Sequence, residues 1–119
     1  MRPSEYFFKE GCFIEEWHNS PNDAAMSVAR VRVEPHQKTR LHSLRDTEER
    51  YVMLQGIAEV TVGTKSWRVT EGDIIVIPAG TPQCIQNLDD TDLLFLAICT
   101  PRFEAVSYTH LRAHETCGH

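Results

Sequence analysis

Two short stretches of the sequence carry the residues best suited to chemistry. The first, residues 35–56, contains a histidine, His42, and an acid, Glu49, each beside an apolar run. The second, residues 72–87, combines an apolar run, a Pro/Gly turn and a polar amide, Gln83. Imidazole and carboxylate groups transfer protons in many active sites and also hold divalent metal ions. We therefore expect a site where the two stretches meet in space.

The elements that position these residues are short strands. Residues 26–33 alternate, with Val31 and Val33 on one face and Arg30 and Arg32 on the other, which is typical of a strand. No long stretch carries apolar residues at the helical spacing of i, i+3, i+4 and i+7. The expected strands are residues 5–8, 12–17, 26–33, 39–44, 49–54, 57–62, 66–69, 74–77, 84–87 and 93–99. Short strands separated by turn signals predict an all-β sandwich or barrel.

Composition limits the classes of function. A chain of 119 residues fits one domain. The formal net charge of -5 and the scattered basic residues argue against nucleic-acid binding. The apolar runs are far shorter than the about 20 residues of a membrane helix, and the N-terminus has no signal-peptide pattern. We expect a cytoplasmic protein that binds neither nucleic acid nor membrane and takes a small molecule.

The last stretch differs from the rest of the chain. Residues 106–119 show no alternation and contain three of the six histidines. The run VSYTHLRAHET resembles a translated sequencing adapter, a scar found in metagenome-derived genes. The alternative is a natural, disordered C-terminus. We therefore expect a barrel formed by residues 1–105, with a non-native tail whose residues His110, His114, Cys117 and His119 form no metal site.

Together the two central stretches resemble the paired motifs of the cupin family. At the positions of the first motif stand His36, His42, Leu44, Glu49 and Gly56. At the positions of the second motif stand Gly72, Pro78, Gly80, Gln83 and Asn87. Three positions depart from the family pattern: His36 replaces a glycine, while Leu44 and Gln83 each replace a histidine. The resemblance covers residues 28–101 and implies a single jelly-roll barrel (a double-stranded β-helix), which in small cupins is commonly a homodimer.

The resemblance also implies a metal site inside the barrel. Cupins with a metal hold a divalent ion through histidines and a glutamate of these motifs, and His42, Glu49 and Gln83 occupy such positions here. An imidazole, a carboxylate and an amide oxygen suit iron, manganese, nickel or zinc. Three protein ligands with open positions are typical of a catalytic metal. The resemblance therefore favours a metal-dependent, dioxygenase-like enzyme that acts on a small polar molecule.

Other interpretations stay open. Tyr51 lies two residues after Glu49 and shares its face, so His42 and Tyr51 fit a metal-free base and acid, as in the sugar-epimerase branch of the family. Gln83 fits a hydrogen bond to Glu49 or to a ligand as well as it fits metal ligation. A buried Glu49 needs a partner, whether a metal, His42 or Arg40. A barrel that captures a small ligand without turnover is a third alternative.

Overall fold

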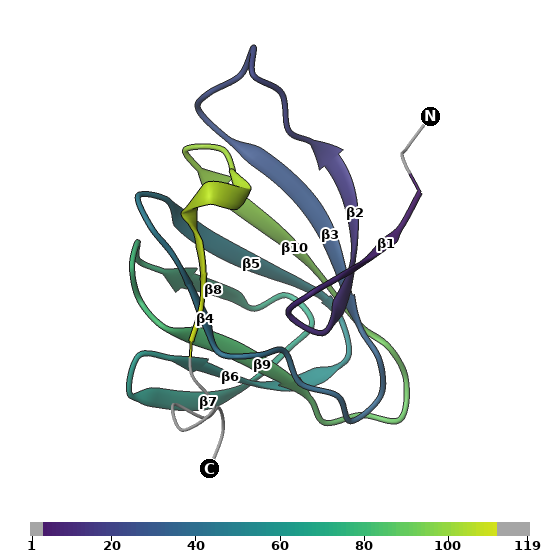
Figure 1. The fold of residues 1–119 in the computed structure, drawn as a ribbon. Helices are drawn as coiled ribbons and strands as arrows, with labels where there is room; N and C mark the ends of the chain where they lie inside the picture. Colours follow the sequence, from purple (N-terminus) through teal and green to yellow (C-terminus); the bar gives the residue numbers. More distant parts are fainter. Residues whose placement is uncertain (1–3, 112–119) are drawn as a thin grey trace.

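The computed structural model describes residues 4–111, which form two antiparallel β-sheets that face each other (Figure 1). The larger sheet has the order β1-β2-β3-β10-β5-β8 and the smaller sheet the order β11-β4-β9-β6-β7. The larger sheet comprises β1 (Tyr6–Phe8), β2 (Cys12–His18), β3 (Ser27–Val33), β5 (Glu48–Gln55), β8 (Ile74–Ile77) and β10 (Leu93–Thr100). The smaller sheet comprises β4 (His42–Leu44), β6 (Ile57–Val62), β7 (Lys65–Thr70), β9 (Gln83–Asn87) and β11 (Tyr108–His110). A short 3-10 helix, η1 (Ala105–Ser107), precedes β11. The prediction of an all-β fold is confirmed.

Strand β5 shows how the alternating pattern positions the site. Glu49, Tyr51 and Met53 are buried and point inward, while the residues between them are half-buried on the outer face. Val52 on that outer face lies opposite Leu96 of β10 and Ile74 of β8. Successive side chains of a strand point to opposite faces, so the acid and the tyrosine predicted to share a face do share it.

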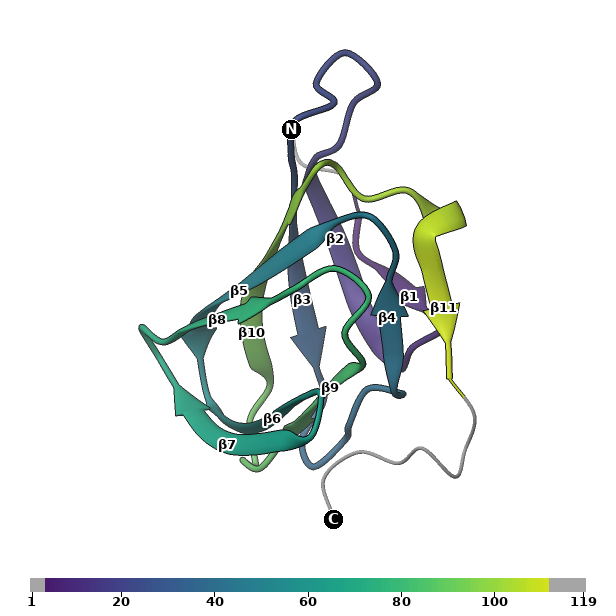
Figure 2. The same ribbon diagram turned by 90° about the vertical axis from the view of Figure 1, so that its left-hand side faces the viewer.

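The apolar core fills the space between the two sheets. The largest fully buried apolar side chains are Phe95, Met53, Ile75, Ile77, Ile85 and Leu93. Burying each such side chain contributes about 1.5–3 kcal/mol. Figure 2 shows β6 and β7 at one end of the barrel, while β1, β4 and β11 lie together at its side. Met53 of β5 and Ile85 of β9 belong to this core, so it holds in place two of the strands that carry candidate site residues.

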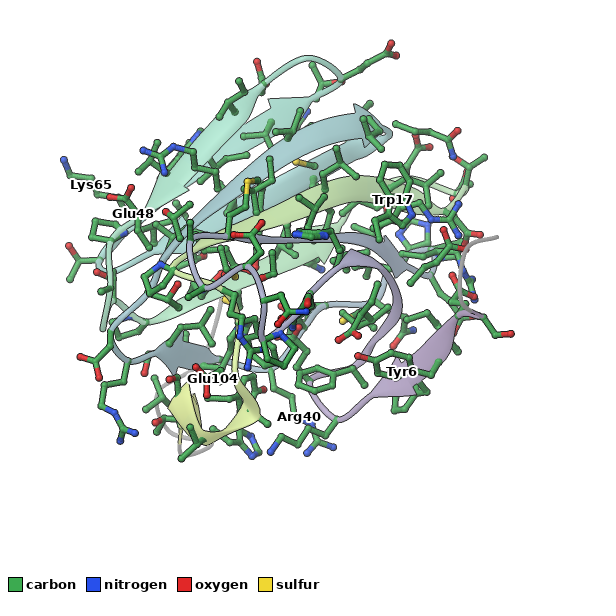
Figure 3. The ribbon with its side chains drawn as sticks, turned by 90° about the horizontal axis from the view of Figure 1, so that it is seen from above. Tyr6, Trp17, Arg40, Glu48, Lys65 and Glu104 are labelled. Carbon is green, nitrogen blue, oxygen red and sulfur yellow. The ribbon has the colours of Figure 1, made fainter. Side chains whose placement is uncertain are left out.

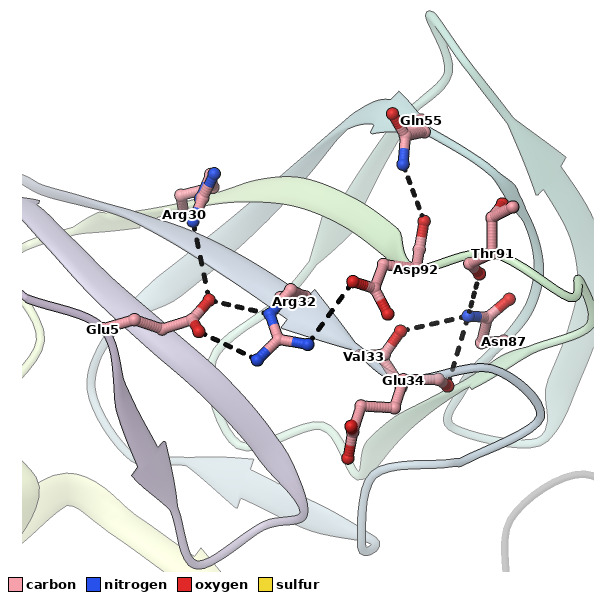
Figure 4. Close-up of polar contacts among 9 residues, drawn as sticks. All are labelled: Glu5, Arg30, Arg32, Val33, Glu34, Gln55, Asn87, Thr91 and Asp92. Atoms are coloured by element: carbon pink, nitrogen blue, oxygen red, sulfur yellow. Dashed lines mark hydrogen bonds and ion pairs between the residues drawn. The ribbon is translucent and has the colours of Figure 1, made fainter.

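Asn87, the last residue of the second motif, ties two loops to the sheet. Its Nδ2 donates to the carbonyl oxygens of Val33, Glu34 and Thr91 at 3.0, 3.2 and 2.8 Å (Figure 4). The side chain is fully buried. Buried carbonyl groups need a donor, so this amide supplies one at the end of β3 and in the two loops that follow β3 and β9.

The N-terminal segment is held by an ion-pair cluster on the outer face of β3. Arg32 binds Glu5 through two hydrogen bonds of 2.9 and 2.8 Å and also contacts Asp92 (Figure 4). Arg30 contacts Glu5 at 3.5 Å. Partly exposed pairs of this kind contribute about 0.2–1 kcal/mol each. Both arginines of β3 are therefore engaged with acidic side chains outside the barrel.

The end of the described chain lies against β4. Strand β11 pairs with β4, with His110 opposite His42 and Tyr108 opposite Leu44. Of the residues expected to form a tail, 106–111 are described and 112–119, which include His114, Cys117 and His119, lie outside the described residues. The origin of residues 106–119 stays a prediction, because strand pairing does not report how a gene was assembled. Within residues 4–111, no helix is long and apolar enough to cross a membrane.

Candidate functional site in the barrel

A pocket opens between the two sheets and contains the candidate residues. It encloses about 660 Å³, including the part open to solvent. His42, Glu49 and Tyr51 line it, together with apolar residues of β2, β3 and β10. Gln83 lies behind this wall, fully buried. Seen from above, Tyr6, Arg40 and Glu104 lie along one margin of the molecule (Figure 3), and Tyr6 is the member of this group that reaches the pocket.

A hydrogen-bonded chain links three of these residues. Gln83 Nε2 donates to Glu49 Oε1 at 2.7 Å. The Tyr51 hydroxyl donates to Gln83 Oε1 at 2.5 Å. The second carboxylate oxygen of Glu49 lies 3.9 Å from the Cys99 thiol, which is a weak donor. The amide of Gln83 is thus fixed between a hydroxyl and a carboxylate, and Glu49 keeps one oxygen without a strong partner among the described residues.

His42 uses both of its ring nitrogens within the protein. Nδ1 lies 2.7 Å from the backbone oxygen of Arg40, which only accepts, so Nδ1 carries the proton. Nε2 lies 2.8 Å from Glu10 Oε2. This second contact has an ion-pair distance but not the alignment of a hydrogen bond, because Glu10 Oε2 has no hydrogen-bond donor among residues 4–111. The ring of Tyr108 stacks on His42, with centroids 5.2 Å apart.

Together, burial and neighbouring charges raise the pKa of both acid–base groups, Glu49 and His42. Burial raises the pKa of Glu49 to about 7, although the hydrogen bond from Gln83 and the nearby His42 oppose this rise. Burial lowers the pKa of His42, but the carboxylate of Glu10 outweighs this effect and the pKa rises to about 8. Burial also raises the pKa of Tyr51 well above its usual value. A carboxylic acid with a pKa near 7 is suited to exchange protons at physiological pH.

Among residues 4–111, two residue pairs that the sequence suggested are not joined by a hydrogen bond. Arg40, named as a partner of Glu49, is exposed, because β4 begins only at His42 and the preceding residues are not a strand. Tyr51, named as a partner of His42 in catalysis, bonds instead to Gln83. Within the described part of the chain, no hydrogen bond joins His42 to Tyr51. The alternative in which Gln83 bonds to Glu49 is the arrangement found.

Glu10 is the site residue that sequence reasoning missed. It lies in the turn between β1 and β2, where a charged residue is usually exposed. Gly11 reverses the chain there with φ +100, and a Cβ added to it would lie 3.4 Å from the backbone oxygen of Lys38. The turn is also held by Arg40 N, which donates to Glu10 O at 2.7 Å. These contacts carry Glu10 inward, where only 9% of it is exposed. An acid beside a glycine reversal was the one sequence signal available.

The arrangement does not fit a metal ion held by His42, Glu49 and Gln83. Gln83 turns its amide nitrogen, not its oxygen, toward Glu49, and an amide NH₂ does not ligate a cation. Both nitrogens of His42 already have partners. Among residues 4–111, no group of three His, Cys, Asp or Glu side chains has the geometry of a metal site.

Comparison with known proteins identifies the family. Residues 29–99 match the family described as "Cupin domain". The chain belongs to the cupin family. The uncharacterized protein MJ1618 of Methanocaldococcus jannaschii is 32% identical over 100 residues, which cover 82% of this chain and 80% of that protein. The sequence resemblance and the expected cupin barrel are both confirmed.

Solved cupins of similar fold include several enzymes. Streptomyces Pac13, a nucleoside dehydratase, is 18% identical with a TM-score of 0.75, over 92% of this chain and 84% of that one. The oxalate decarboxylase of Lactobacillus farciminis is 25% identical with a TM-score of 0.78, over 91% of this cupin and 33% of that chain. The Bacillus subtilis oxalate decarboxylase, which has Mn(II) centres, is 24% identical with a TM-score of 0.78, over 91% of this cupin and 30% of that chain.

Proposed function

We propose that this cupin is an enzyme that transfers protons to and from a small polar molecule bound in the barrel, without a metal ion. Glu49 is the catalytic acid and base, and Gln83 and Tyr51 are positioning residues. The observation that carries the proposal is the burial of Glu49 in the pocket wall, with one oxygen fixed by Gln83 and the other lacking a strong partner among residues 4–111. Isomerases, epimerases and dehydratases all need such a group.

The hydrogen-bonded chain explains how Glu49 works in either protonation state. When Glu49 is ionised, Gln83 Nε2 stabilises the charge on Oε1. Tyr51 holds the Gln83 carbonyl and so prevents the amide from rotating. A substrate C–H or O–H group that approaches the other oxygen, Oε2, exchanges its proton there. His42 lowers the cost of the ionised form through its charge, and this replaces the role as base that the sequence alternative gave it.

A proton-exchange assay tests the proposal. It uses pools of candidate compounds, so the substrate need not be known in advance. Pools of small hydroxy, keto and amino compounds are incubated with the protein in D₂O, and loss of C–H signals is followed by proton NMR. We expect exchange or conversion of a pool member that survives EDTA and is lost in Glu49→Gln. Glu48→Gln, which changes the exposed neighbouring acid, is the matched control. Full exchange in Glu49→Gln would refute the assignment.

A metal-dependent, dioxygenase-like enzyme is the second candidate. It is favoured by the motif positions of His42, Glu49 and Gln83 and by the likeness to oxalate decarboxylases, of which the Bacillus subtilis enzyme has Mn(II) centres. This function needs a different arrangement from the one described, because His42 must leave Glu10 and Gln83 must turn its oxygen inward. Iron, manganese, nickel and zinc are the ions to test.

Metal content separates the two candidates. The protein is loaded with each ion, desalted and analysed by inductively coupled plasma mass spectrometry, beside His42→Ala. Metal held in the barrel would disappear in this variant, whereas metal held by the histidines of residues 106–119 would remain. Stoichiometric metal that is lost in His42→Ala supports the second candidate and contradicts the first. Ligand-induced thermal stabilisation without any product would instead support a non-catalytic binding cupin.

We also propose that the cupin is a homodimer. The edge strand β8 carries two exposed apolar side chains on its outer face, Ile74 at 62% and Val76 at 47% exposure. Contiguous exposed apolar residues on a sheet often mark an interface. Light scattering on the wild-type protein and on Ile74→Lys tests the proposal, with a shift from dimer to monomer expected.

A further inference from the structure

The charges in the pocket are unevenly distributed. Its titratable lining consists of three glutamates and two histidines besides tyrosines and a cysteine, and within residues 4–111 no lysine or arginine lines it. The glutamates are Glu10, Glu16 and Glu49, and the histidines are His18 and His42. The chain has 12 lysine and arginine residues in total, so their absence from the lining does not reflect scarcity.

The cationic side chains near the pocket already have partners. Lys9 Nζ lies 4.6 Å from the centroid of the Tyr108 ring, without lining the pocket itself. Arg30 and Arg32 contact Glu5 and Asp92 (Figure 4). Arg30 also contacts Glu15. None of these three acids lines the pocket. Of the two histidines, His42 forms an ion pair with Glu10, so these two charges offset each other. The second, His18, lies 2.7 Å from Asp23. Glu16 is therefore left without a balancing cation in the pocket lining, and Glu49 shares the charge of His42 with Glu10.

The remaining walls are rich in aromatic rings. Six aromatic side chains line the pocket, namely Tyr6, Phe8, Tyr51, Phe95, Phe103 and Tyr108. The faces of aromatic rings attract cations, by about 2 kcal/mol where water is excluded. Carboxylates combined with aromatic walls favour a positively charged guest over a neutral guest of the same shape, and both disfavour an anion.

A buried oxygen in the pocket lacks a hydrogen-bond partner. Glu10 Oε2, in a residue that is only 9% exposed, already has His42 Nε2 beside it at 2.8 Å. The Tyr108 hydroxyl, in contrast, is buried without a hydrogen-bond partner among the described residues. A buried polar atom without a partner costs free energy, and a ligand that carries N–H groups would supply a donor to this hydroxyl. This observation is independent of the distribution of charge.

From these features we infer that the pocket binds a small organic cation of the ammonium class, with its N–H groups near the Tyr108 hydroxyl and its charge between Glu16 and the aromatic walls. The inference rests on the proposed function, since it names the class of molecule on which Glu49 would act. It excludes carboxylates and phosphorylated molecules as preferred ligands. The formal net charge of -5 of the whole chain also favours the approach of cations.

Three probes of equal length test the inference: butylammonium, 1-butanol and butyrate. Each is titrated into the full chain at pH 7.5, and dissociation constants are taken from amide chemical shifts in nitrogen–proton NMR spectra. We expect butylammonium to bind about tenfold more tightly than butanol, and butyrate to bind least tightly. Equal affinity of butylammonium and butanol, preference for butyrate, or no shift of pocket amides with any probe would overturn the inference.

Two variants locate the source of the preference. Glu16→Gln removes one pocket carboxylate and should reduce the ratio of butylammonium to butanol affinity several-fold. Glu71→Gln makes the same change of net charge at an exposed turn and should leave the ratio unchanged. An equal fall in both variants would mean that net charge alone attracts the cation, and this result would overturn the pocket assignment.

Failure of the inference and failure of the proposed function give different results. If butylammonium is preferred but Glu49→Gln keeps full proton exchange, the pocket binds cations and Glu49 is not the catalytic group. If the preference is absent but Glu49→Gln loses exchange, Glu49 is catalytic and the ligand belongs to another class.

Discussion

Replacing Glu49 by glutamine should remove a large part of the dependence of stability on pH. Glu49 is 8% exposed and has a pKa of about 7 in the folded protein, against an ordinary value of 4.5. Between these two values the folded protein holds a proton that the unfolded chain has lost. Stability therefore falls as pH rises through this window, because ionising the buried acid is opposed by desolvation.

The magnitude follows from the two pKa values. One pH unit corresponds to about 1.4 kcal/mol, so the interval from 4.5 to about 7 is worth about 3 kcal/mol of folding free energy. His42 adds a fall of about 2 kcal/mol between its ordinary value of 6.5 and its folded pKa of about 8. In Glu49→Gln only the fall in stability that comes from His42 should remain. The difference in stability between variant and wild type should therefore change by about 2–3 kcal/mol between pH 5 and pH 8, because part of the fall lies below pH 5.

Urea unfolding, followed by circular dichroism at several pH values from 5 to 8, measures this difference. Glu48→Gln is the matched control, because the side chain of Glu48 is 40% exposed and pairs with Arg50. Its profile should be parallel to that of the wild type throughout. Parallel profiles for wild type and Glu49→Gln between pH 5 and pH 7 would refute the reasoning, since they would show that the acid is not held neutral by burial.

Two further predictions concern backbone and charge. Gly56, which turns β5 into β6, has φ +103, and an added Cβ would lie 3.1 Å from Leu93 Cδ1, whereas Gly72 has φ +90 and open space around it. Gly56→Ala and Gly72→Ala should both lose about 1–2 kcal/mol of stability from the left-handed backbone, with a larger loss at Gly56; equal losses in urea unfolding would contradict a role for the contact with Leu93. Glu10→Gln should lower the pKa of His42 from about 8, because burial then acts without the carboxylate that chiefly opposes it. Carbon–proton NMR of the imidazole measures this pKa, Glu16→Gln is the control, and a value that stays near 8 would show that Glu10 is not the cause.

Much of the fold was predictable from local pattern. Alternation identified β3, and the spacing of Glu49, Gly56, Gly72, Pro78 and Gly80 indicated the cupin barrel. The prediction contained no counterpart of β11 (Tyr108–His110) and was inaccurate for β4, which was expected over residues 39–44 and begins only at His42. Thr39 there bonds to Ile85 through both its backbone and its hydroxyl, so the segment follows β9 without forming a strand. Contacts with a distant strand decided this, and local propensity cannot report them.

By itself the sequence determined most of the strands, the family and the motif residues that enter the barrel, because these depend on the period of the side chains and on turn chemistry. It also placed Glu49 and Tyr51 on one face. Only the tertiary structure decided the partners. The pairing of β5 with β10 and β8, and of β9 with β6, positions Glu49 beside Gln83, and the turn at Gly11 brings Glu10 to His42. Hydrogen-bond partners far apart in the chain depend on the relative placement of whole strands, which no local pattern encodes.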